Sequence, residues 1–482
     1  MESHAHKSLD SRVLGELRAI LGDDGIISRA TELKVYECDG WTIEKNAPEV
    51  LLRPRTTAEI SDILKLLNRH GVAFVPRGAG TGLSGGCLPA GAPVMICTSR
   101  MNRILAIDTA NRRVEVESGV VNLNVSNAVK AHGLFYAPDP SSQVACTIGG
   151  NIAENSGGPH TLKYGVTTNH VLGLEIVLPD GTIAELGGPA EERCGYDLVG
   201  AIVGAEGTAG IVTRATLRLV REPEAHRTML AIFTDVDDAT RAVSAIIAAG
   251  IIPGAIEMMD QLVIRAVEAA FHAGFPEDAG AVLIVELDGL AAAMDEHARR
   301  VTELVRAAGA REVRLARDEN ERATLWKARK RAFGAAGRLA PNYATQDGVV
   351  PRTRLPDILR AISAISRRHN LQIGNVFHAG DGNIHPIVLY DERDPSQVRR
   401  AIDAGREILM ACVEMGGSLT GEHGIGAEKM AEMPLIFSPD DLLVMSELRR
   451  VFDPGERSNP NKVIPRPGGC VEVAMPRRQA AL

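Results

Sequence analysis

The stretch Arg77–Gly86, RGAGTGLSGG, has five glycines in ten residues and contains the pattern G-x-G-x-x-G at Gly80, Gly82 and Gly85. In a Rossmann fold this pattern opens a helix whose N-terminus binds a pyrophosphate. The residues that follow, GCLPAGAPV, contain two prolines and cannot begin a regular helix. The stretch instead indicates a coil whose successive backbone N–H groups converge on a diphosphate. Taken alone, such a loop can also be simply a tight connection between two elements, which is the alternative here.

Two further glycine-rich clusters follow, PDPSSQVACTIGGNIAENSGGPHTLKYG at 138–165 and VGAEGTAGIVT at 203–213. Three such clusters predict one long ligand that lies against much of the backbone. A dinucleotide bound in a manner unlike the Rossmann fold fits this pattern. The candidate cofactor-binding residues are Pro76, Arg77, Gly78, Ala79, Gly80, Thr81, Gly82, Gly85, Pro138, Asp139, Gly149, Gly150, Asn155, Gly158, Gly165, Glu206, Gly207 and Ile211.

The composition of the 482-residue chain excludes several classes of protein. A net charge of -8, from 53 basic and 61 acidic residues, argues against nucleic-acid binding, which needs a basic surface. The seven cysteines are dispersed and form no C-x-x-C, which excludes an iron–sulfur cluster of the usual spacing. Dispersed cysteines favour a reducing, cytoplasmic location. No apolar run is long enough for a transmembrane segment.

The pattern of apolar residues predicts two α/β regions separated by a break at Pro223. Before the break we expect a helix over 8–22 and a strand–turn–helix–strand unit over 49–78, with Thr57 as the N-cap of its helix. After it, residues 228–260 predict strand–helix–strand, and 281–289 predict a strand followed by a helix. The expected division is an N-terminal helical segment at 1–45, domains at 46–225 and 226–465, and a tail at 466–482.

The stretch GNVFHAGDGNIHPIVLY at 374–390 is the most informative part of the second domain. It predicts a β-hairpin with Asp381-Gly382 at the turn. In that register His378 lies opposite His385, close enough for both imidazoles to bind one metal ion. Two paired histidines without a metal are the alternative, and a one-residue shift of the turn would remove the opposition.

A third candidate ligand lies in GGSLTGEHGIG at 416–426, where Glu422 precedes His423. A Glu-His pair in such a coil is often only a solvated turn. Two imidazoles and one carboxylate, however, leave an open position and are typical of a catalytic divalent-metal site. In LWKARKRAF at 325–333, Arg329 could bind a carboxylate through two parallel hydrogen bonds. The alternative there is a basic, solvated helix face.

The stretches FVPRGAGTGLSGG, IGGNIAENSGGPHTLKYG and GAEGTAGIVT, in this order and spacing, resemble the FAD-binding domain of the vanillyl-alcohol oxidase and p-cresol methylhydroxylase superfamily. From about Pro48 to Pro465 the chain resembles its FAD-linked 2-hydroxy-acid dehydrogenases: the glycolate oxidase flavin subunit, D-lactate dehydrogenase and D-2-hydroxyglutarate dehydrogenase. The resemblance implies an α+β fold, with two α/β subdomains around FAD, an α/β substrate (cap) domain and a C-terminal helical segment. Some relatives bind flavin covalently through a histidine of the first loop; because Arg77–Gly86 has none, we expect non-covalent FAD.

The resemblance also assigns roles in the second domain. It implies His378, His385 and Glu422 as ligands of a divalent metal such as zinc or manganese, His423 as the general base, and Arg329 as a substrate contact. His423 would take the hydroxyl proton with assistance from the metal, and a hydride would pass to flavin N5. Position 387, an asparagine in the hydroxyglutarate enzymes, is Ile387 here, which argues against a dicarboxylate substrate.

These expectations describe an FAD-dependent dehydrogenase of a short D-2-hydroxy acid, such as glycolate or D-lactate. The alternatives are a D-2-hydroxyglutarate or other larger D-2-hydroxy-acid dehydrogenase, and a flavin-binding subunit active only within a complex. An NAD-dependent dehydrogenase is a rival that would need a true Rossmann unit, and a metal hydrolase is a rival that would use the same ligand set but would not explain a flavin cradle. The electron acceptor would be external: a quinone, a cytochrome, an electron-transfer flavoprotein or an iron–sulfur subunit. Such partners could form a hetero-oligomer and hold the chain at the inner membrane.

Overall fold

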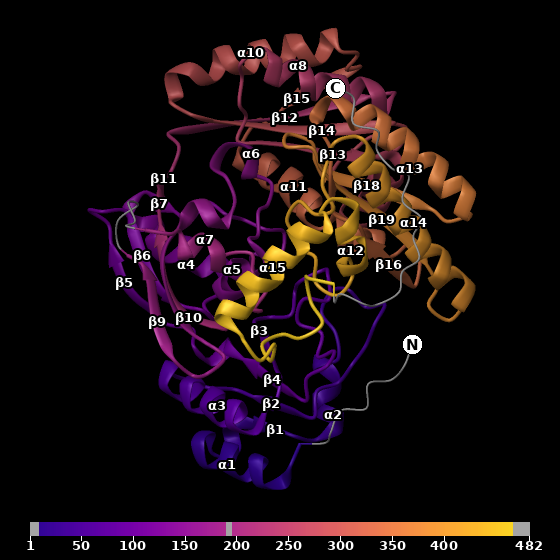
Figure 1. Ribbon diagram of the computed structural model, residues 1–482. Coiled ribbons are helices and arrows are strands. Elements are labelled where there is room, and N and C mark those ends of the chain that lie inside the picture. The colour runs from indigo at the N-terminus through magenta and orange to yellow at the C-terminus, as the bar shows by residue number, and fades with distance from the viewer. Residues whose placement is uncertain (1–8, 189–194, 466–482) are drawn as a thin grey trace.

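The computed structural model describes residues 9–188 and 195–465 (Figure 1). The glycine-rich stretch Arg77–Gly86 begins at the last residue of strand β3 in the N-terminal sheet. This four-stranded sheet has the order β1-β2-β4-β3. Helix α3 packs on it and is itself covered by α1 through Val13 and Leu17. The bounds are β1 Ile26–Ile27, β2 Val50–Leu52, β3 Phe74–Arg77, β4 Val94–Cys97, α1 Ser11–Leu21, α2 Ala30–Leu33 and α3 Thr57–His70.

The predicted strand–helix–strand unit is present, but its helix cap lies one residue earlier than expected. Thr56, rather than Thr57, is the N-cap of α3, and its hydroxyl accepts a hydrogen bond from the Glu59 backbone N–H. Thr57 points elsewhere and donates to Glu175 of the next sheet at 2.6 Å. Two adjacent threonines are equivalent as caps in a sequence, and the partner on the next sheet decides between them.

The second sheet is five-stranded, with the order β5-β6-β10-β8-β9, and lies beside the first in Figure 1. The two sheets and their helices form the first domain, in which a small two-stranded sheet pairs β7 with β11. The bounds are β5 Ile104–Asp108, β6 Arg113–Glu117, β7 Leu134–Phe135, β8 Val171–Val177, β9 Ile183–Gly187, β10 Ile211–Arg218, β11 Val220–Arg221, α4 Asn122–Val129, α5 Ile148–Glu154, α6 Thr161–Tyr164 and α7 Leu198–Ile202.

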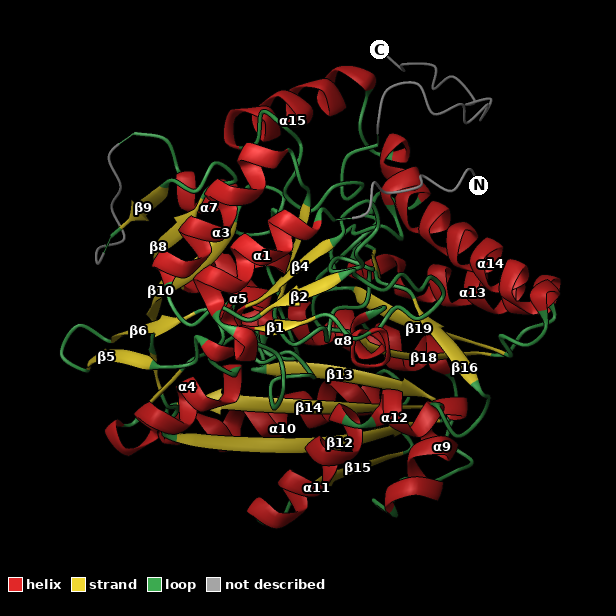
Figure 2. Cartoon of the chain, turned by 90° about the horizontal axis from the view of Figure 1, so that it is seen from below, coloured by secondary structure: helices red, strands yellow, loops and turns green. Residues whose placement is uncertain are grey.

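The second domain is built on an eight-stranded sheet of order β15-β12-β14-β13-β18-β19-β16, with β17 paired to β19. Helices α8, α10, α13 and α14 cover one face, and α9, α11 and α12 cover the other (Figure 2). The bounds are β12 Ala225–Phe233, β13 Ala255–Asp260, β14 Ala281–Gly289, β15 Glu312–Leu315, β16 Asn342–Thr345, β17 Gly348–Val349, β18 Ile373–His378, β19 Asn383–Tyr390, α8 Val236–Ala248, α9 Gln261–Phe271, α10 Ala291–Ala307, α11 Glu319–Lys330, α12 Ala332–Ala336, α13 Leu355–His369 and α14 Pro395–Glu414.

Alternation along the strands explains why helices lie on both faces of this sheet. In β12, Met229, Ala231 and Phe233 pack on one face, whereas Leu230 and Ile232 pack on the other. All five side chains are buried, as a strand covered on both sides requires.

The chain end returns from the second domain to the first. After α15, Pro439–Phe452, Ser458 forms a parallel bridge with Phe74, and its hydroxyl donates to the Gly207 carbonyl at 2.7 Å. The Asn459 side chain donates to the carbonyls of Gly86 and Glu206, at 2.8 and 2.6 Å. The first domain is therefore completed by residues near the end of the chain. The predicted tail at 466–482 lies outside the described residues.

Two expected absences can be checked in the described part of the chain. Residues 81–93, which follow the G-x-G-x-x-G pattern, contain no helix, so the loop is not a Rossmann loop. No described helix combines the length and hydrophobicity needed to cross a membrane.

Candidate active site

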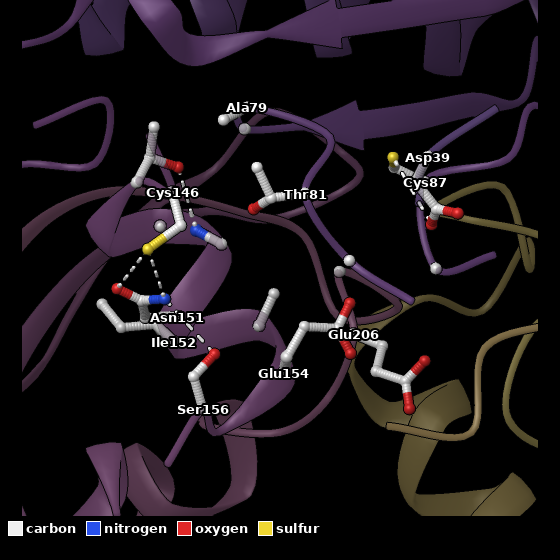
Figure 3. A pocket seen from close by; sticks show the side chains of 18 of the residues that line it. Asp39, Ala79, Thr81, Cys87, Cys146, Asn151, Ile152, Glu154, Ser156 and Glu206 are labelled. Atoms are coloured by element: carbon white, nitrogen blue, oxygen red, sulfur yellow. Dashed lines mark hydrogen bonds between the residues drawn. The ribbon is translucent and has the colours of Figure 1, made fainter. Parts of the chain in front are cut away.

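A cavity of about 370 Å³ runs from the three glycine clusters of the first domain to the histidines of the second. Figure 3 shows its first-domain end, with Thr81, Asn151, Glu154 and Glu206 around it. Twelve of the predicted cofactor-binding residues line it: Pro76, Arg77, Gly78, Ala79, Gly80, Thr81, Gly82, Gly149, Gly150, Glu206, Gly207 and Ile211.

Glycine is required where the first two clusters meet. A Cβ at Gly78 would lie 2.3 Å from Oγ1 of Thr147, the N-cap of α5, and a Cβ at Gly149 would lie 2.8 Å from the Ser118 side chain. Gly80 has φ +70°, a conformation that L side chains rarely adopt. The wall therefore has bare backbone at these glycines and no room for their side chains, a surface suited to an extended dinucleotide.

The other six predicted cofactor residues do not line the cavity. Gly85 packs beside Trp41, and Asn155 ends α5 in the left-handed region with φ 53°. Asp139 binds His160 and Lys330, although its neighbour Pro140 does line the cavity. The remaining three lie near these turns without lining the cavity: Pro138, Gly158 and Gly165.

Several polar residues that line the cavity were not predicted. Glu154 lies beside Glu206, whose carboxylate accepts the backbone N–H groups of Ile425 and Gly426 at 2.7 Å each (Figure 3). Burial and the neighbouring Glu206 raise the pKa of Glu154 well above its usual value. Glu206 was among the predicted residues, whereas Glu154 was not. The available signal for Glu154 was an acidic residue in a glycine-rich stretch without a basic residue nearby in the sequence. The other unpredicted polar lining residues include Ser142, Thr147, Asn151, Ser156 and Asn459.

The predicted hairpin exists, but its register differs from the expected one. His378 pairs with Asn383 and His385 with Val376, because the connection is the four residues 379–382 and not a two-residue turn. The shift moves the partner of His378 by two positions, so both histidines stay on one face of the sheet. Their rings are edge to face, with centroids 5.1 Å apart.

Glu422 completes the predicted ligand set. Its Oε1 lies 3.1 Å from Nε2 of His378 and 3.2 Å from Nε2 of His385. One donor atom from each residue lies within 4.8 Å of the other two. Two imidazole nitrogens and a carboxylate oxygen this close suit a zinc or manganese ion with an open coordination position.

Two further carboxylates, absent from the predictions, stand behind the histidines. Glu257 contacts Nδ1 of His378 at 2.8 Å, and Asp347 lies 3.6 Å from Nδ1 of His385. Burial opposes protonation of His378, but Glu257 and Glu422 outweigh it and raise the pKa of His378 well above its usual value. Carboxylates in these positions orient metal-binding imidazoles with Nε2 forward.

Asp347 also holds the loop that carries Glu422 and His423. Its Oδ2 accepts the Thr420 hydroxyl at 2.6 Å and the backbone N–H groups of residues 421–423 at 2.9–3.2 Å. The His423 ring stacks on His385, with centroids 4.7 Å apart and planes 6° from parallel. Burial lowers the pKa of His423 to about 4, so its imidazole is neutral at neutral pH.

Arg329 and Lys330 are neighbours at the end of α11 but face different surroundings. The Arg329 side chain is 1% exposed, forms an ion pair with Glu257 and does not line the cavity. Lys330 lines the cavity, and its Nζ donates to Asp139 at 3.0 Å. The predicted contact between Arg329 and substrate stays a prediction.

A glycine-built dinucleotide cradle and a histidine–carboxylate cluster in one cavity define a flavin-dependent oxidoreductase. The chain belongs to the FAD-linked oxidase family: residues 222–463 match the family model "FAD linked oxidases, C-terminal domain", and residues 48–187 match "FAD binding domain". The resemblance recognised in the sequence is thereby confirmed.

Similar curated proteins cover almost the whole chain. Glycolate oxidase subunit GlcD of Escherichia coli K12 is 45% identical over 460 residues, which cover 95% of this chain and 92% of that protein. GlcD of Bacillus subtilis 168 is 40% identical over 89% of this chain and 92% of its own length. A probable mitochondrial D-lactate dehydrogenase of Danio rerio is 31% identical over 94% and 92%.

Solved structures confirm the expected fold class. Substrate-bound p-cresol methylhydroxylase matches with a TM-score of 0.78 at 17% identity, over 94% of this chain and 96% of that one. Alkyldihydroxyacetonephosphate synthase matches with a TM-score of 0.74 at 18% identity, over 94% and 85%. At these identities the match concerns the fold alone.

Proposed function

We propose that this protein is an FAD-dependent dehydrogenase that oxidises a short D-2-hydroxy acid, glycolate or D-lactate, to the 2-oxo acid. One observation carries the proposal: the glycine cradle and the cluster of His385, Glu422 and His423 line the same cavity. The names of the similar proteins, glycolate oxidase subunit and D-lactate dehydrogenase, support this substrate class.

The residues present fit both the flavin and a metal ion. Gly78 and Gly149 keep the cradle wall free of side chains, while His378, His385 and Glu422 converge on one point. When bound, FAD supplies a two-electron acceptor, and a divalent cation supplies a Lewis acid for the substrate oxygens. The chain's own residues would orient the acid and remove its hydroxyl proton.

In this proposal His423 is the base. It lines the cavity, is held by Asp347 through its backbone N–H, and stacks on His385. Burial keeps its imidazole neutral, so the ring can take the hydroxyl proton of a substrate in the cavity. Held beside the predicted metal ligands, it acts where the hydroxyl is bound.

A larger D-2-hydroxy acid such as D-2-hydroxyglutarate is the second candidate substrate. Ile387 is buried within the apolar cluster between the sheet and α9, where it offers nothing to a distal carboxylate. This favours the short acids.

Electrons must leave the flavin for an external acceptor, because no iron–sulfur motif occurs in the chain. The relatives named as subunits support activity within a larger complex. A quinone, a cytochrome, an electron-transfer flavoprotein or an iron–sulfur subunit remains the predicted acceptor. The cytoplasmic location, with attachment to the inner membrane through partners, also stays a prediction.

An anaerobic substrate panel tests the proposal. Purified protein with bound FAD is mixed with glycolate, D- and L-lactate and D-2-hydroxyglutarate, and the visible flavin band is followed. We expect glycolate or D-lactate to bleach it fastest and L-lactate to leave it unchanged. Chelation of the metal should stop bleaching while FAD stays bound. A flavin that no 2-hydroxy acid reduces would contradict the proposal.

A further inference from the structure

We propose that Glu206 is a positioning residue that couples the flavin cradle to the loop carrying Glu422 and His423, so that FAD and the metal ion strengthen each other's binding. The inference rests on the proposed function, because it takes a flavin in the cradle and a divalent ion at the histidine cluster. The sequence predicted Glu206 only as one of the cofactor-binding residues.

Two carboxylates from different domains hold the backbone of the loop around His423. Asp347 of the second domain accepts the N–H groups of residues 421–423 at 2.9–3.2 Å. Glu206 of the first domain accepts the N–H groups of residues 425 and 426 at 2.7 Å each. The metal ligand and the base on this loop are therefore fixed from both domains at once.

The end of the loop also contacts the first glycine cluster directly. The backbone N–H groups of Ala427 and Glu428 both donate to the Ser84 carbonyl at 3.0 Å. A Cβ at Gly426 would lie 2.1 Å from the same carbonyl oxygen, so the loop and the cluster are in close contact. The loop is thus held by the second domain where it begins and by the flavin cradle where it ends.

Glu206 is placed to transmit a change in the cradle to this loop. It lines the cavity beside Glu154 (Figure 3), and its backbone lies in the left-handed region with φ 50°. Its N–H donates to the Ala153 carbonyl of α5 at 2.8 Å, and its carbonyl accepts from the Asn459 side chain at 2.6 Å. A ligand that fills the cavity restrains this segment, and with it the carboxylate that holds the loop.

The contact between Glu206 and the loop leaves little room for independent movement. A Cβ at Gly424 would lie 2.3 Å from Oε2 of Glu154 and 2.8 Å from Oε1 of Glu206. The buried Lys429 donates to the Gly424 carbonyl at 3.2 Å and lies 3.4 Å from Oδ2 of Asp347. Its charge offsets the cost of burying carboxylates at this loop. Glu206 therefore cannot shift without moving the loop.

Binding at the two sites is linked through this contact, and such linkage is reciprocal. A filled cradle restrains Glu206, Glu206 restrains the loop, and the loop presents Glu422 to the two histidines. FAD should raise the affinity for the metal by the same factor as the metal raises the affinity for FAD. Couplings of this kind are typically about 5-fold or more.

The experiment uses the full chain loaded with FAD and measures the Kd of FAD by flavin fluorescence, with Zn²⁺ present and after chelation. In wild type, chelation should raise this Kd about 5-fold or more, a shift that leaves the cofactor bound at high protein concentration. Glu206→Gln replaces one acceptor oxygen by an NH₂ donor, so the cradle no longer holds both N–H groups of the loop. In this variant chelation should change the Kd of FAD by less than about twofold.

Two further variants separate positioning from a general defect. Gly424→Ala crowds the same contact from the loop side and should also lose the zinc effect. Glu117→Gln should keep it, because Glu117 is a buried carboxylate of the first domain that binds Arg103 outside the cavity. A loss of stability alone would weaken FAD binding equally with and without zinc.

A Kd of FAD that does not depend on zinc in wild type, or a zinc effect that persists in Glu206→Gln, would overturn the inference. Competition with a coloured chelator shows whether wild type binds zinc; if it does not, the proposed metal site fails and the inference with it. Coupled binding of zinc and FAD in a protein whose flavin no 2-hydroxy acid reduces would support the inference and contradict the proposed substrate class.

Discussion

His423 is the residue on which the proposed chemistry depends. His423→Ala should abolish bleaching of the flavin by substrate, a loss of at least about 100-fold in the reduction rate, because no other base replaces the imidazole. FAD content should be unchanged, since the glycine cradle is untouched. Stopped-flow spectroscopy under anaerobic conditions measures both. His132→Ala, which removes an exposed histidine outside the cavity, is the control; normal reduction in His423→Ala would remove the residue from its role.

Glu257 is a buried carboxylate that contacts Nδ1 of His378 and would support the proposed metal site without binding the metal itself. Glu257→Gln removes the charge that orients His378, so we expect metal affinity to fall about 10- to 100-fold. Metal content and competition with a coloured chelator measure the change. Equal affinity in variant and wild type would show that Glu257 serves only as the partner of Arg329.

Glu257 and Asp347, which contact the two histidines, could not be predicted from the sequence. The histidines and Glu422 were predicted because they belong to recognisable stretches, and the structure brings their donor atoms together. Glu257 lies between apolar residues in β13, AIEMMD, where a buried charge indicates that a partner exists but does not identify it. For Arg329 and Lys330, adjacent on one helix, the surroundings of each side chain depend on tertiary packing.

At the scale of elements, the loop after β3 and the start of α5 fit only because Gly78 lacks a side chain. Gly78→Ala should push Thr147 from its capping position, lower the free energy of unfolding by about 1–3 kcal/mol and reduce FAD binding. Gly15→Ala, within α1 and with open space around its Cβ, should stabilise by about 0.5–1 kcal/mol. Thermal unfolding measures the stability of both variants, and FAD titration measures their affinity for the cofactor. Equal stability and equal FAD affinity in Gly78→Ala and Gly15→Ala would contradict the packing argument.

In the hairpin of β18 and β19, the predicted register was wrong, but the predicted proximity of His378 and His385 was right. The Asp381-Gly382 pair predicted a two-residue turn, but the connection has four residues. A shift of the pairing by two positions preserves the face of every side chain, so His378 and His385 remain neighbours. The alternation of the strands was therefore more reliable than the turn. Local sequence did not determine the loop length because Gly380 and Gly382 pack against Leu162 and Val350 of other elements.

At the scale of the whole molecule, the two domains are joined by a polar network around His160. Its Nδ1 contacts Asp139 of the first domain, and its Nε2 lies 3.4 Å from Glu286 of the second. The ring also stacks on Trp326, whose indole N–H donates to Glu286 at 2.5 Å. Burial opposes protonation of His160, but Asp139 and Glu286 outweigh it and raise its pKa to about 10.

This network predicts a dependence of stability on pH. Because the folded pKa exceeds the unfolded value of 6.5, the contribution of His160 is complete below pH 6.5 and is lost as pH rises through about 10. His160→Gln should therefore be less stable than wild type at pH 6, by about 1.5–3 kcal/mol, and the difference should shrink toward pH 10. Chemical unfolding across this range tests it, with His132→Gln as control; a difference that stays constant with pH would contradict the assignment.

The domain order of the fold was accessible from the sequence, because glycine clusters and strand patterns are local. The contacts of Ser458 and Asn459 with the first domain could not be predicted from the sequence. The stretch SNP at 458–460 has no pattern that indicates its partners, which are Phe74, Gly207 and Gly86. Contacts between residues 251 and 373 positions apart leave no periodic signal in the sequence.

That closing contact affects how the protein is made. The ribosome synthesises the cradle residues hundreds of codons before it reaches Asn459. The Asn459 side chain lines the cavity, and its amide donates hydrogen bonds to the carbonyls of Gly86 and Glu206. We therefore expect the flavin cradle to be complete only once residues 458 and 459 have been synthesised, and a chain that stops shortly before position 458 to bind flavin more weakly.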